Sequence, residues 1–142
     1  MINKGKVLAV DYGSKRVGIA TGDFEFGIAF PRDVFENKSL EELISLIKDL
    51  VEELSVVLIV VGLPLNMSEE YSENKIFKGV LRFVEELKKS VDVEIELFDE
   101  RLSTFEASAL MKEAKELKSG DLKRDAFAAQ IILQRFFDKS KH

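Results

Sequence analysis

The sequence contains no cysteine, and its single histidine is the final residue, His142. The absence of cysteine excludes disulfides, thiol catalysis and every zinc or iron–sulfur site built on thiolate ligands. A histidine at a chain end, where the backbone is usually mobile, argues against a Ser-His-Asp triad or a histidine general base. Any catalytic chemistry must therefore rely on carboxylates, lysine, tyrosine or a metal ion held by oxygen ligands.

Long apolar runs are also missing. The longest, at residues 56–61, is too short to cross a bilayer. The N-terminal residues lack the apolar core and cleavage site of a signal peptide, so we expect a cytoplasmic protein with no membrane partner. The 142 residues are 46% hydrophobic and 33% charged, a balance that predicts one globular domain spanning residues 1–142.

The net charge of −5 counts mildly against nucleic-acid binding, because contacts to phosphate supply much of the affinity in such complexes. It does not exclude binding, since a local basic cluster or a bound cation can dominate the field of a site.

Hydrophobic patterning predicts an α/β fold. Three strands are expected first, and helices and strands then alternate, which favours a mixed sheet with an antiparallel meander at one side and helices on both faces. Pro31 marks an edge or an exit of the third strand. The phenylalanine stripe at positions 24, 26, 30 and 35 is interpreted as core. The expected strands are 7–11, 16–21, 24–35, 56–61 and 91–98, and the expected helices are 39–54, one ending near 89, 103–118 and one capped by Asp121 that reaches about 137.

Three acidic residues stand at the ends of apolar segments. Asp11 closes the first strand, Glu100 follows the last strand, and Asp125 lies in the first turn of the last helix, on its apolar stripe. Ionised carboxylates are almost never buried unless they are paired or bound to a metal, and carboxylate oxygens are the ligands that Mg²⁺ and Mn²⁺ prefer. Ligand sites of open α/β sheets lie beyond the carboxyl ends of the strands, where Asp11 and Glu100 are expected.

Each acid also has an ordinary structural interpretation. Asp11 fits a plain hairpin turn, and Asp125 fits a helix start, where the dipole favours an acid. Strict alternation places Glu100 on the face of Glu94 and Glu96, so the strand must twist or end early for Glu100 to point at Asp11.

Four motifs occur in order along nearly the whole chain. They are Asp-Tyr-Gly at 11–13 followed by Arg-Val-Gly at 16–18, Gly-Leu-Pro-Leu-Asn-Met at 62–67, Asp-Glu-Arg-Leu-Ser-Thr at 99–104, and Asp125 with Ala-Ala at 128–129 and Ile-Leu-Gln at 132–134. Together these motifs resemble the YqgF (RuvX) family, whose members are described as Holliday junction resolvases and as pre-16S rRNA nucleases. The stretch at 68–71, Ser-Glu-Glu-Tyr, departs from the glycine-containing turn that is common in the family.

The resemblance implies a ribonuclease-H-like fold with a mixed five-stranded sheet, and a catalytic site in which Asp11, Glu100 and Asp125 hold Mg²⁺ or Mn²⁺, with two ions flanking the scissile phosphate. Cations beside such a site suit phosphate contacts. The candidate nucleic-acid-binding residues are Lys15, Arg16, Asn66, Arg101 and Ser103.

The implied function is metal-dependent hydrolysis of phosphodiesters, with the 5′ end of pre-16S rRNA as the substrate. A Holliday junction resolvase acting on four-way DNA is the alternative, and a non-catalytic nucleic-acid-binding module or a phosphotransferase of the actin and sugar-kinase type are rivals. A two-fold symmetric junction suits a dimer, so both a monomer and a homodimer are open.

Overall fold

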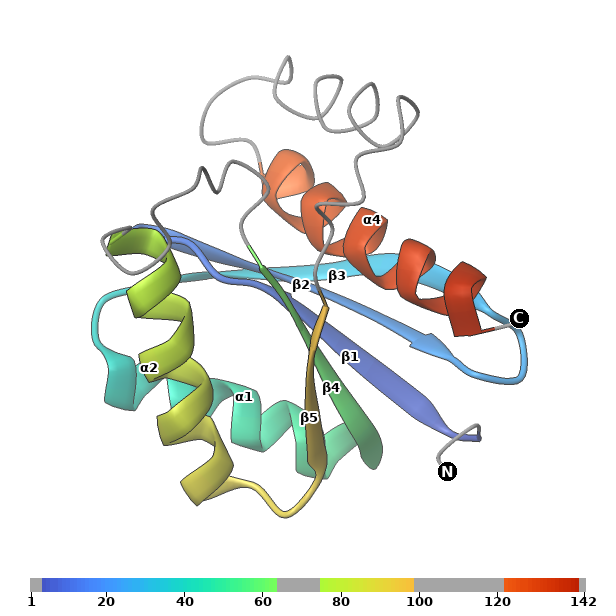
Figure 1. Cartoon of the computed structure of the whole chain (residues 1–142), viewed down its shortest axis with the longest axis horizontal. Coiled ribbons are helices and arrows are strands. Elements are labelled where there is room, and N and C mark those ends of the chain that lie inside the picture. Colours follow the sequence, from blue (N-terminus) through green and yellow to red (C-terminus); the bar gives the residue numbers. More distant parts are fainter. Residues whose placement is uncertain (1–3, 64–74, 99–121, 141–142) are drawn as a thin grey trace.

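The computed structural model describes residues 4–63, 75–98 and 122–140. Three strands come first and helices then alternate with strands (Figure 1). The elements in chain order are β1 (Lys6–Asp11), β2 (Arg16–Asp23), β3 (Ile28–Glu36), α1 (Leu40–Leu54), β4 (Val56–Gly62), α2 (Lys75–Ser90), β5 (Glu94–Phe98) and α4 (Leu122–Ser140).

The strands form a five-stranded sheet in the order β3-β2-β1-β4-β5. Strands β1 and β3 each run antiparallel to β2, whereas β4 is parallel to β1 and β5 is parallel to β4. Parallel neighbours need crossover connections, and α1 and α2 lie in those connections. The predicted mixed sheet, with its antiparallel meander at one side, is confirmed.

Helices α1 and α2 cover one face of the sheet (Figure 1). Alternate residues of the central strands, such as Leu8, Ile19 and Ile59, belong to this core layer and are fully buried. Helix α1 begins after Ser39, whose hydroxyl oxygen accepts a hydrogen bond from the Glu42 backbone N–H at 3.1 Å. This cap satisfies one of the free donors at the helix start, as the sequence pattern predicts.

Helix α4 covers the opposite face (Figure 1), so the prediction of helices on both faces is confirmed. Leu133 and Phe137 pack with Ala9 in this second core layer. At the end of β4, a Cβ atom added to Gly62 would lie 2.5 Å from the Ile132 Cδ1 atom. The missing side chain therefore lets α4 lie close to the carboxyl end of β4.

The outer edge of β3 is covered by two glutamines from α4. The Gln134 side chain accepts a hydrogen bond from the Ala29 N–H at 2.9 Å and donates one to the Gly27 carbonyl oxygen at 2.9 Å. Gln130 donates to the Ala29 carbonyl oxygen at 3.1 Å. Pro31, which has no N–H, follows on the same strand, so the prediction of a proline at an edge is confirmed. The glutamine side chains bond to backbone groups of this edge, and Pro31 lacks a backbone donor. Both features leave fewer free groups with which another strand could pair.

The starts of two strands differ from the prediction by three residues or more, each for a local reason. Strand β3 starts later than residue 24, because the preceding residues form a turn in which the Gly27 N–H donates to the Asp23 carbonyl oxygen at 2.8 Å. Strand β5 starts at Glu94 rather than at 91, because the Val91 N–H donates to the Leu87 carbonyl oxygen at 3.1 Å and continues the end of α2.

The interpretation of the phenylalanine stripe as core is wrong for two of its members. Phe24 and Phe35 pack against the core layers, but Phe26 is 74% exposed and Phe30 is 58% exposed. Phe26 belongs to the turn before β3, and Phe30 lies on the edge strand β3, where it pairs with Thr21 of β2. Edge position, which periodicity does not reveal, leaves Phe30 uncovered.

The described helices include none that is long and apolar enough to span a membrane. Helix α4 ends at Ser140, slightly beyond the predicted end. The helix predicted at 103–118 and the predicted Asp121 cap lie outside the described residues.

Candidate functional site

Asp11 is the last residue of β1, and the residues before it, 7–10, are fully buried. It pairs with Gly18 of β2 and is itself half-buried. Val7 and Ala9 lie in the core layer under α4, and side chains alternate between the faces of a strand. The Asp11 side chain therefore belongs to the α4 face of the sheet, at the carboxyl end of β1.

Tyr12 turns to the opposite face. Its ring stacks on Phe83 of α2 with ring centroids 4.9 Å apart. A Cβ atom added to Gly79 would lie 3.4 Å from the Tyr12 ring, so the backbone of α2 passes close by. This contact ties the loop after Asp11 to α2 and agrees with the interpretation of Tyr12 as a packing residue.

The loop between β1 and β2 is held by a residue that sequence reasoning missed, Asn37. Its side-chain amide donates to the Gly13 carbonyl oxygen at 2.8 Å, and its backbone N–H donates to the Lys15 carbonyl oxygen at 2.8 Å. A Cβ atom on Gly13 would lie 2.5 Å from the Arg16 carbonyl oxygen, so the turn requires glycine there. The residues that follow Asp11 thus have their backbone fixed from two sides.

The two predicted phosphate-binding cations of this loop differ in setting. Lys15 is exposed on the turn, whereas Arg16 is half-buried at the start of β2. Val17 and Ile19 belong to the core layer under α1 and α2, so alternation places Arg16 on the other face, the face of Asp11. The structure therefore brings Arg16 to the Asp11 side of the sheet and leaves Lys15 open to solvent.

The ends of β4 and β5 lie side by side. Gly62 pairs with Phe98, and the Leu63 N–H donates to the Phe98 carbonyl oxygen at 3.0 Å. In β1 and β4, Val10 pairs with Val61, so the next residues, Asp11 and Gly62, are level with each other. The segments that start at these two strand ends carry four predicted site residues that lie outside the described residues, namely Asn66, Glu100, Arg101 and Ser103.

The side of the sheet on which Phe98 lies shows which side the acids Glu94 and Glu96 of β5 occupy, and the prediction for Glu100 is based on these acids. Phe98 packs against Phe136 of α4, with ring centroids 5.8 Å apart. Glu94 and Glu96 share its alternation along β5, so the face of these acids is the α4 face, to which Asp11 also belongs. The face of Glu94 and Glu96, on which the need for a twist is based, is thus the face of Asp11, while Glu100 itself lies outside the described residues and its direction stays a prediction.

Asp125 lies in the first turn of α4, and its side chain is outside the described part of the structure. Its neighbour Ala126 lines an open hollow of about 400 Å³ together with Val34 of β3. Val34 pairs with Gly18, which in turn pairs with Asp11. The backbone at the start of α4 therefore lies at the same end of the sheet as Asp11.

The described residues contain no group of three acidic, histidine or cysteine side chains that could hold a metal ion. Two of the three predicted ligands, Glu100 and the side chain of Asp125, are not among them. The three-carboxylate site stays a prediction.

Two residues with structural roles have no clear signal in the sequence: Asn37, at the Asp11 end of the sheet, and Gln134, which contacts β3 at the opposite end. Asn37 stands between a strand and a helix cap, where asparagine is common for local reasons. Gln134 is part of a motif, but its hydrogen bonds to β3 join positions that are far apart in the sequence. Only the pairing of the strands and the position of α4 create these contacts.

The arrangement of strands and helices defines the class of protein. The chain has a ribonuclease-H-like fold. It is similar over 96% of its length to T. thermophilus RuvC in complex with a Holliday junction substrate, with a TM-score of 0.62, 10% sequence identity and 96% coverage of that chain. The fowlpox virus Holliday junction resolvase matches 94% of the chain with a TM-score of 0.57, 11% identity and 99% coverage. At these identities the likeness concerns the fold alone.

Sequence comparison identifies the family. A family model described as "RuvX: Holliday junction resolvase" matches residues 5–139, and the chain belongs to this family. A Rickettsia rickettsii protein named "Putative pre-16S rRNA nuclease" is 34% identical over 100% of this chain and 92% of its own length. A Nitrosospira multiformis protein of the same name is 36% identical over 95% of this chain and 89% of its own length. The resemblance inferred from the four motifs is confirmed.

Proposed function

We propose that this protein is a divalent-metal-dependent nuclease that hydrolyses phosphodiester bonds at the 5′ end of pre-16S rRNA. The observation that carries the proposal is the position of Asp11, at the carboxyl end of a buried strand and on the face that α4 covers. The names of the full-length relatives support the RNA substrate. We further propose that residues 1–142 act as one domain and that the protein works in the cytoplasm, where rRNA is processed in bacteria such as these relatives.

The geometry around Asp11 is compatible with Glu100 and Asp125 as its partners. Neighbouring strands lie about 4.8 Å apart, so β5 is about 10 Å from β1, with β4 between them. Glu100 follows Phe98 by a stretch of chain that spans up to about 7 Å, and a glutamate side chain adds further reach. The first turn of α4, with Asp125, lies at the same end of the sheet. Three carboxylates from three elements can therefore converge beyond β1.

A set of three carboxylates fits Mg²⁺ or Mn²⁺, because these hard cations take oxygen ligands. When bound, such ions supply Lewis acidity and an activated water for phosphodiester hydrolysis. Lys15 and Arg16 would contact the phosphates of the substrate, with Arg101, Asn66 and Ser103 as further predicted contacts. The hydrogen bonds from Asn37 would keep the Asp11 loop in place while the substrate binds.

Holliday junction resolution is the second candidate, favoured by the description of the family and by the resolvases that share the fold. Both reactions are hydrolyses of a phosphodiester and would use the same carboxylates. They differ in the shape of the substrate and in symmetry, since a four-way junction has two equivalent strands to cut and suits a dimer.

The decisive experiment compares the two substrates directly. The purified protein would be incubated with a 5′-extended 16S rRNA precursor and with a four-way DNA junction of mobile sequence, each with Mg²⁺, with Mn²⁺ and with excess chelator. We expect metal-dependent cleavage of the RNA near the mature 5′ end and much slower cleavage of the junction. The oligomeric state would be measured by light scattering in the same buffers.

Paired symmetric cuts in the junction, without cleavage of the RNA, would favour the resolvase. Binding that persists in chelator, with no cleavage of either substrate in Mg²⁺ or Mn²⁺, would favour the non-catalytic binding module.

A further inference from the structure

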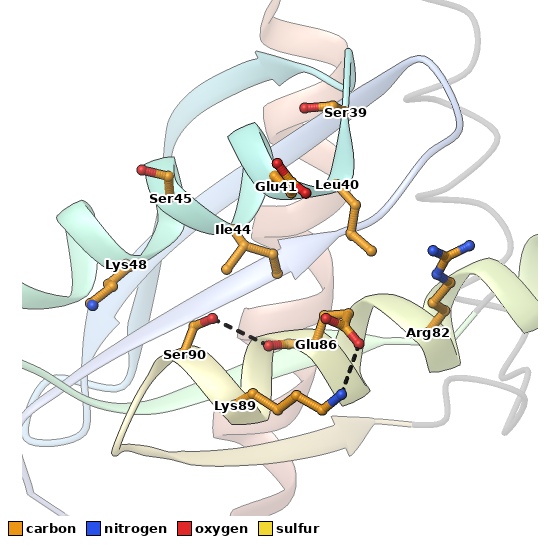
Figure 2. A pocket seen from close by; sticks show the side chains of 10 residues that line it. All are labelled: Ser39, Leu40, Glu41, Ile44, Ser45, Lys48, Arg82, Glu86, Lys89 and Ser90. Carbon is orange, nitrogen blue, oxygen red and sulfur yellow. Dashed lines mark hydrogen bonds and ion pairs between the residues drawn. The ribbon is translucent and has the colours of Figure 1, made fainter.

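An open groove of about 910 Å³ lies between α1 and α2, on the face of the sheet opposite α4 (Figure 2). Residues of α1 and its cap form one wall and the second half of α2 forms the other. The lining residues are Ser39, Leu40, Glu41, Ile44, Ser45, Lys48, Arg82, Glu86, Lys89 and Ser90. None of them is part of the predicted catalytic site.

Two cations stand at opposite ends of this groove. Figure 2 shows Arg82 beyond the Leu40 end and Lys48 at the end near Ser90. Both side chains are exposed, and within the described residues neither takes part in an ion pair.

The other charged residues that line the groove are one ion pair and one further acid. Lys89 Nζ lies 3.1 Å from a carboxylate oxygen of Glu86, so these two charges mostly compensate each other. Glu41, exposed in the first turn of α1, is the remaining acid of the lining. The available charge is therefore positive at both ends, with one negative group on the α1 wall.

The Arg82 end of the groove is close to the Asp11 loop. Phe83, the next residue of α2, stacks on Tyr12, and Tyr12 directly follows Asp11. One turn earlier, the α2 backbone at Gly79 passes within van der Waals reach of the same ring. The groove therefore starts beside the segment that carries Asp11 and leads away from it along α2.

The length of the groove suits a few nucleotides. At 1.5 Å rise per residue, α2 advances about 10 Å from Arg82 to Lys89. Neighbouring phosphates of one strand lie farther apart than the rise of about 3.4 Å along the helix axis, so about two phosphates could follow this wall. In a protein with a net charge of −5, unpaired cations spaced along a groove are the feature that would attract such a strand.

We propose that the α1–α2 groove binds the phosphodiester backbone of the nucleic-acid segment that flanks the cleaved bond, with Arg82 and Lys48 as its phosphate contacts. The proposal rests on the proposed nuclease function and adds a second contact region, distinct from the carboxylates and from the Asp11 loop. It also makes a prediction about sign: loss of a cation weakens binding, and loss of the Glu41 charge strengthens it.

The test uses three RNAs with the same cleavage site, one short, one extended on the 5′ side and one extended on the 3′ side. Binding to Lys48→Ala, Arg82→Ala and the double variant would be measured by fluorescence anisotropy over a range of salt concentrations. Lys88→Ala is the matched control, because Lys88 is exposed on the same helix and does not line the groove. Unfolding curves would confirm that these surface changes keep the fold.

We expect the double variant to raise the Kd of one extended RNA by roughly tenfold and to flatten its salt slope by about one unit per cation. The short RNA should bind and be cleaved as by the unchanged protein. Glu41→Gln should lower the Kd of the same extended RNA. Junctions with long and short arms, measured in parallel, show whether DNA is held in the same way.

The proposal is overturned if the double variant behaves like Lys88→Ala with both extended RNAs, or if Glu41→Gln weakens binding. It is also overturned if the short RNA loses as much affinity as the long ones, because the cations would then act on the whole protein. Cleavage with no effect of the variants would leave the nuclease proposal intact and remove the groove. Binding that depends on the groove cations, without any cleavage, would support the groove and contradict the nuclease proposal.

Discussion

The side chain of Asn37 holds the loop that follows Asp11, through a hydrogen bond from its amide to the Gly13 carbonyl oxygen at 2.8 Å. A second bond, from the Asn37 backbone N–H to the Lys15 carbonyl oxygen, lies next to it. The residue follows the last strand of the meander, so the end of β3 braces the turn between β1 and β2. Asn37 thereby couples the edge of the sheet to the candidate catalytic loop.

Asn37→Ala should lower kcat strongly and lower the free energy of unfolding only slightly. Loss of one half-buried hydrogen bond should cost about 1 kcal/mol in the free energy of unfolding. The loop that positions Asp11 should become less fixed, and small displacements of reacting groups slow catalysis strongly. Urea unfolding and single-turnover cleavage would measure the two effects. Lys38→Ala, an exposed neighbour, is the control, and an equal loss of activity in both variants would deny Asn37 its positioning role.

Gly13→Ala and Gly79→Ala should change stability in opposite directions. A Cβ atom at position 13 would lie 2.5 Å from the Arg16 carbonyl oxygen, so the backbone of the turn must shift, at a cost of about 1–3 kcal/mol. At position 79 the new atom would meet the Tyr12 ring at 3.4 Å, an ordinary contact, and alanine in a helix gains about 0.5–1 kcal/mol over glycine. Thermal unfolding of both variants checks the signs. A Gly13→Ala protein as stable as the original would show that the turn tolerates a side chain.

Asp11→Asn should abolish cleavage and leave the fold intact. Without metal, the Tm should hold or rise, because repulsion among neighbouring acids falls when one charge is removed. Asp23→Asn is the control, since Asp23 stands at the opposite end of the same β1–β2 pair. Circular dichroism and cleavage with Mn²⁺ would be measured for both. Cleavage by Asp11→Asn at the original rate would sink the metal-site model.

Lys15→Ala and Arg16→Ala should weaken substrate binding more than they weaken metal binding. Each phosphate contact that is lost should flatten the plot of log K against log salt by about one unit. Lys4→Ala, exposed at the far end of β1, is the control. RNA binding would be titrated at several salt concentrations to measure this slope for each variant. Unchanged slopes in both variants would place these cations outside the interface.

Mg²⁺ or Mn²⁺ should raise the Tm, because a ligand that binds only the folded state stabilises it, by about 2.7 kcal/mol at a concentration of 100 Kd. Asp125→Asn should reduce this stabilisation together with activity, whereas Asp138→Asn, in the last turn of the same helix, should not. Ca²⁺ should stabilise the protein but support cleavage poorly, because its coordination is longer and looser. If metal still stabilises Asp125→Asn fully and cleavage persists, two carboxylates form the site.

The local signals of the chain predict most of the fold. The apolar runs of β1 and β4 and the Ser39 cap of α1 each depend on residues close together in the sequence. The absence of cysteine limits the chemistry that these 142 residues can perform, whatever their fold. The position of Asp11 at the end of a buried strand could be predicted in the same way, because a short apolar run followed by a polar residue indicates both the burial and the end of a strand.

Only the tertiary structure decided which face each strand residue occupies. Phe98 shows its face through Phe136, and this contact places the acids of β5 on the side of Asp11. The shift of register between Ile19 and Ala20 in the β2–β3 pair is likewise invisible to periodicity.

Contacts between distant segments were decided in the same way. The amide of Gln134 meets the edge of β3 only once α4 has packed across the sheet, and Asn37 meets Gly13 only once the meander is paired. The exposure of Phe30 follows from its place on the edge strand. The sequence determined by itself the elements and the available chemistry, because these depend on neighbours along the chain. The faces, the edges and the support of the Asp11 loop were decided by packing between residues far apart in the chain.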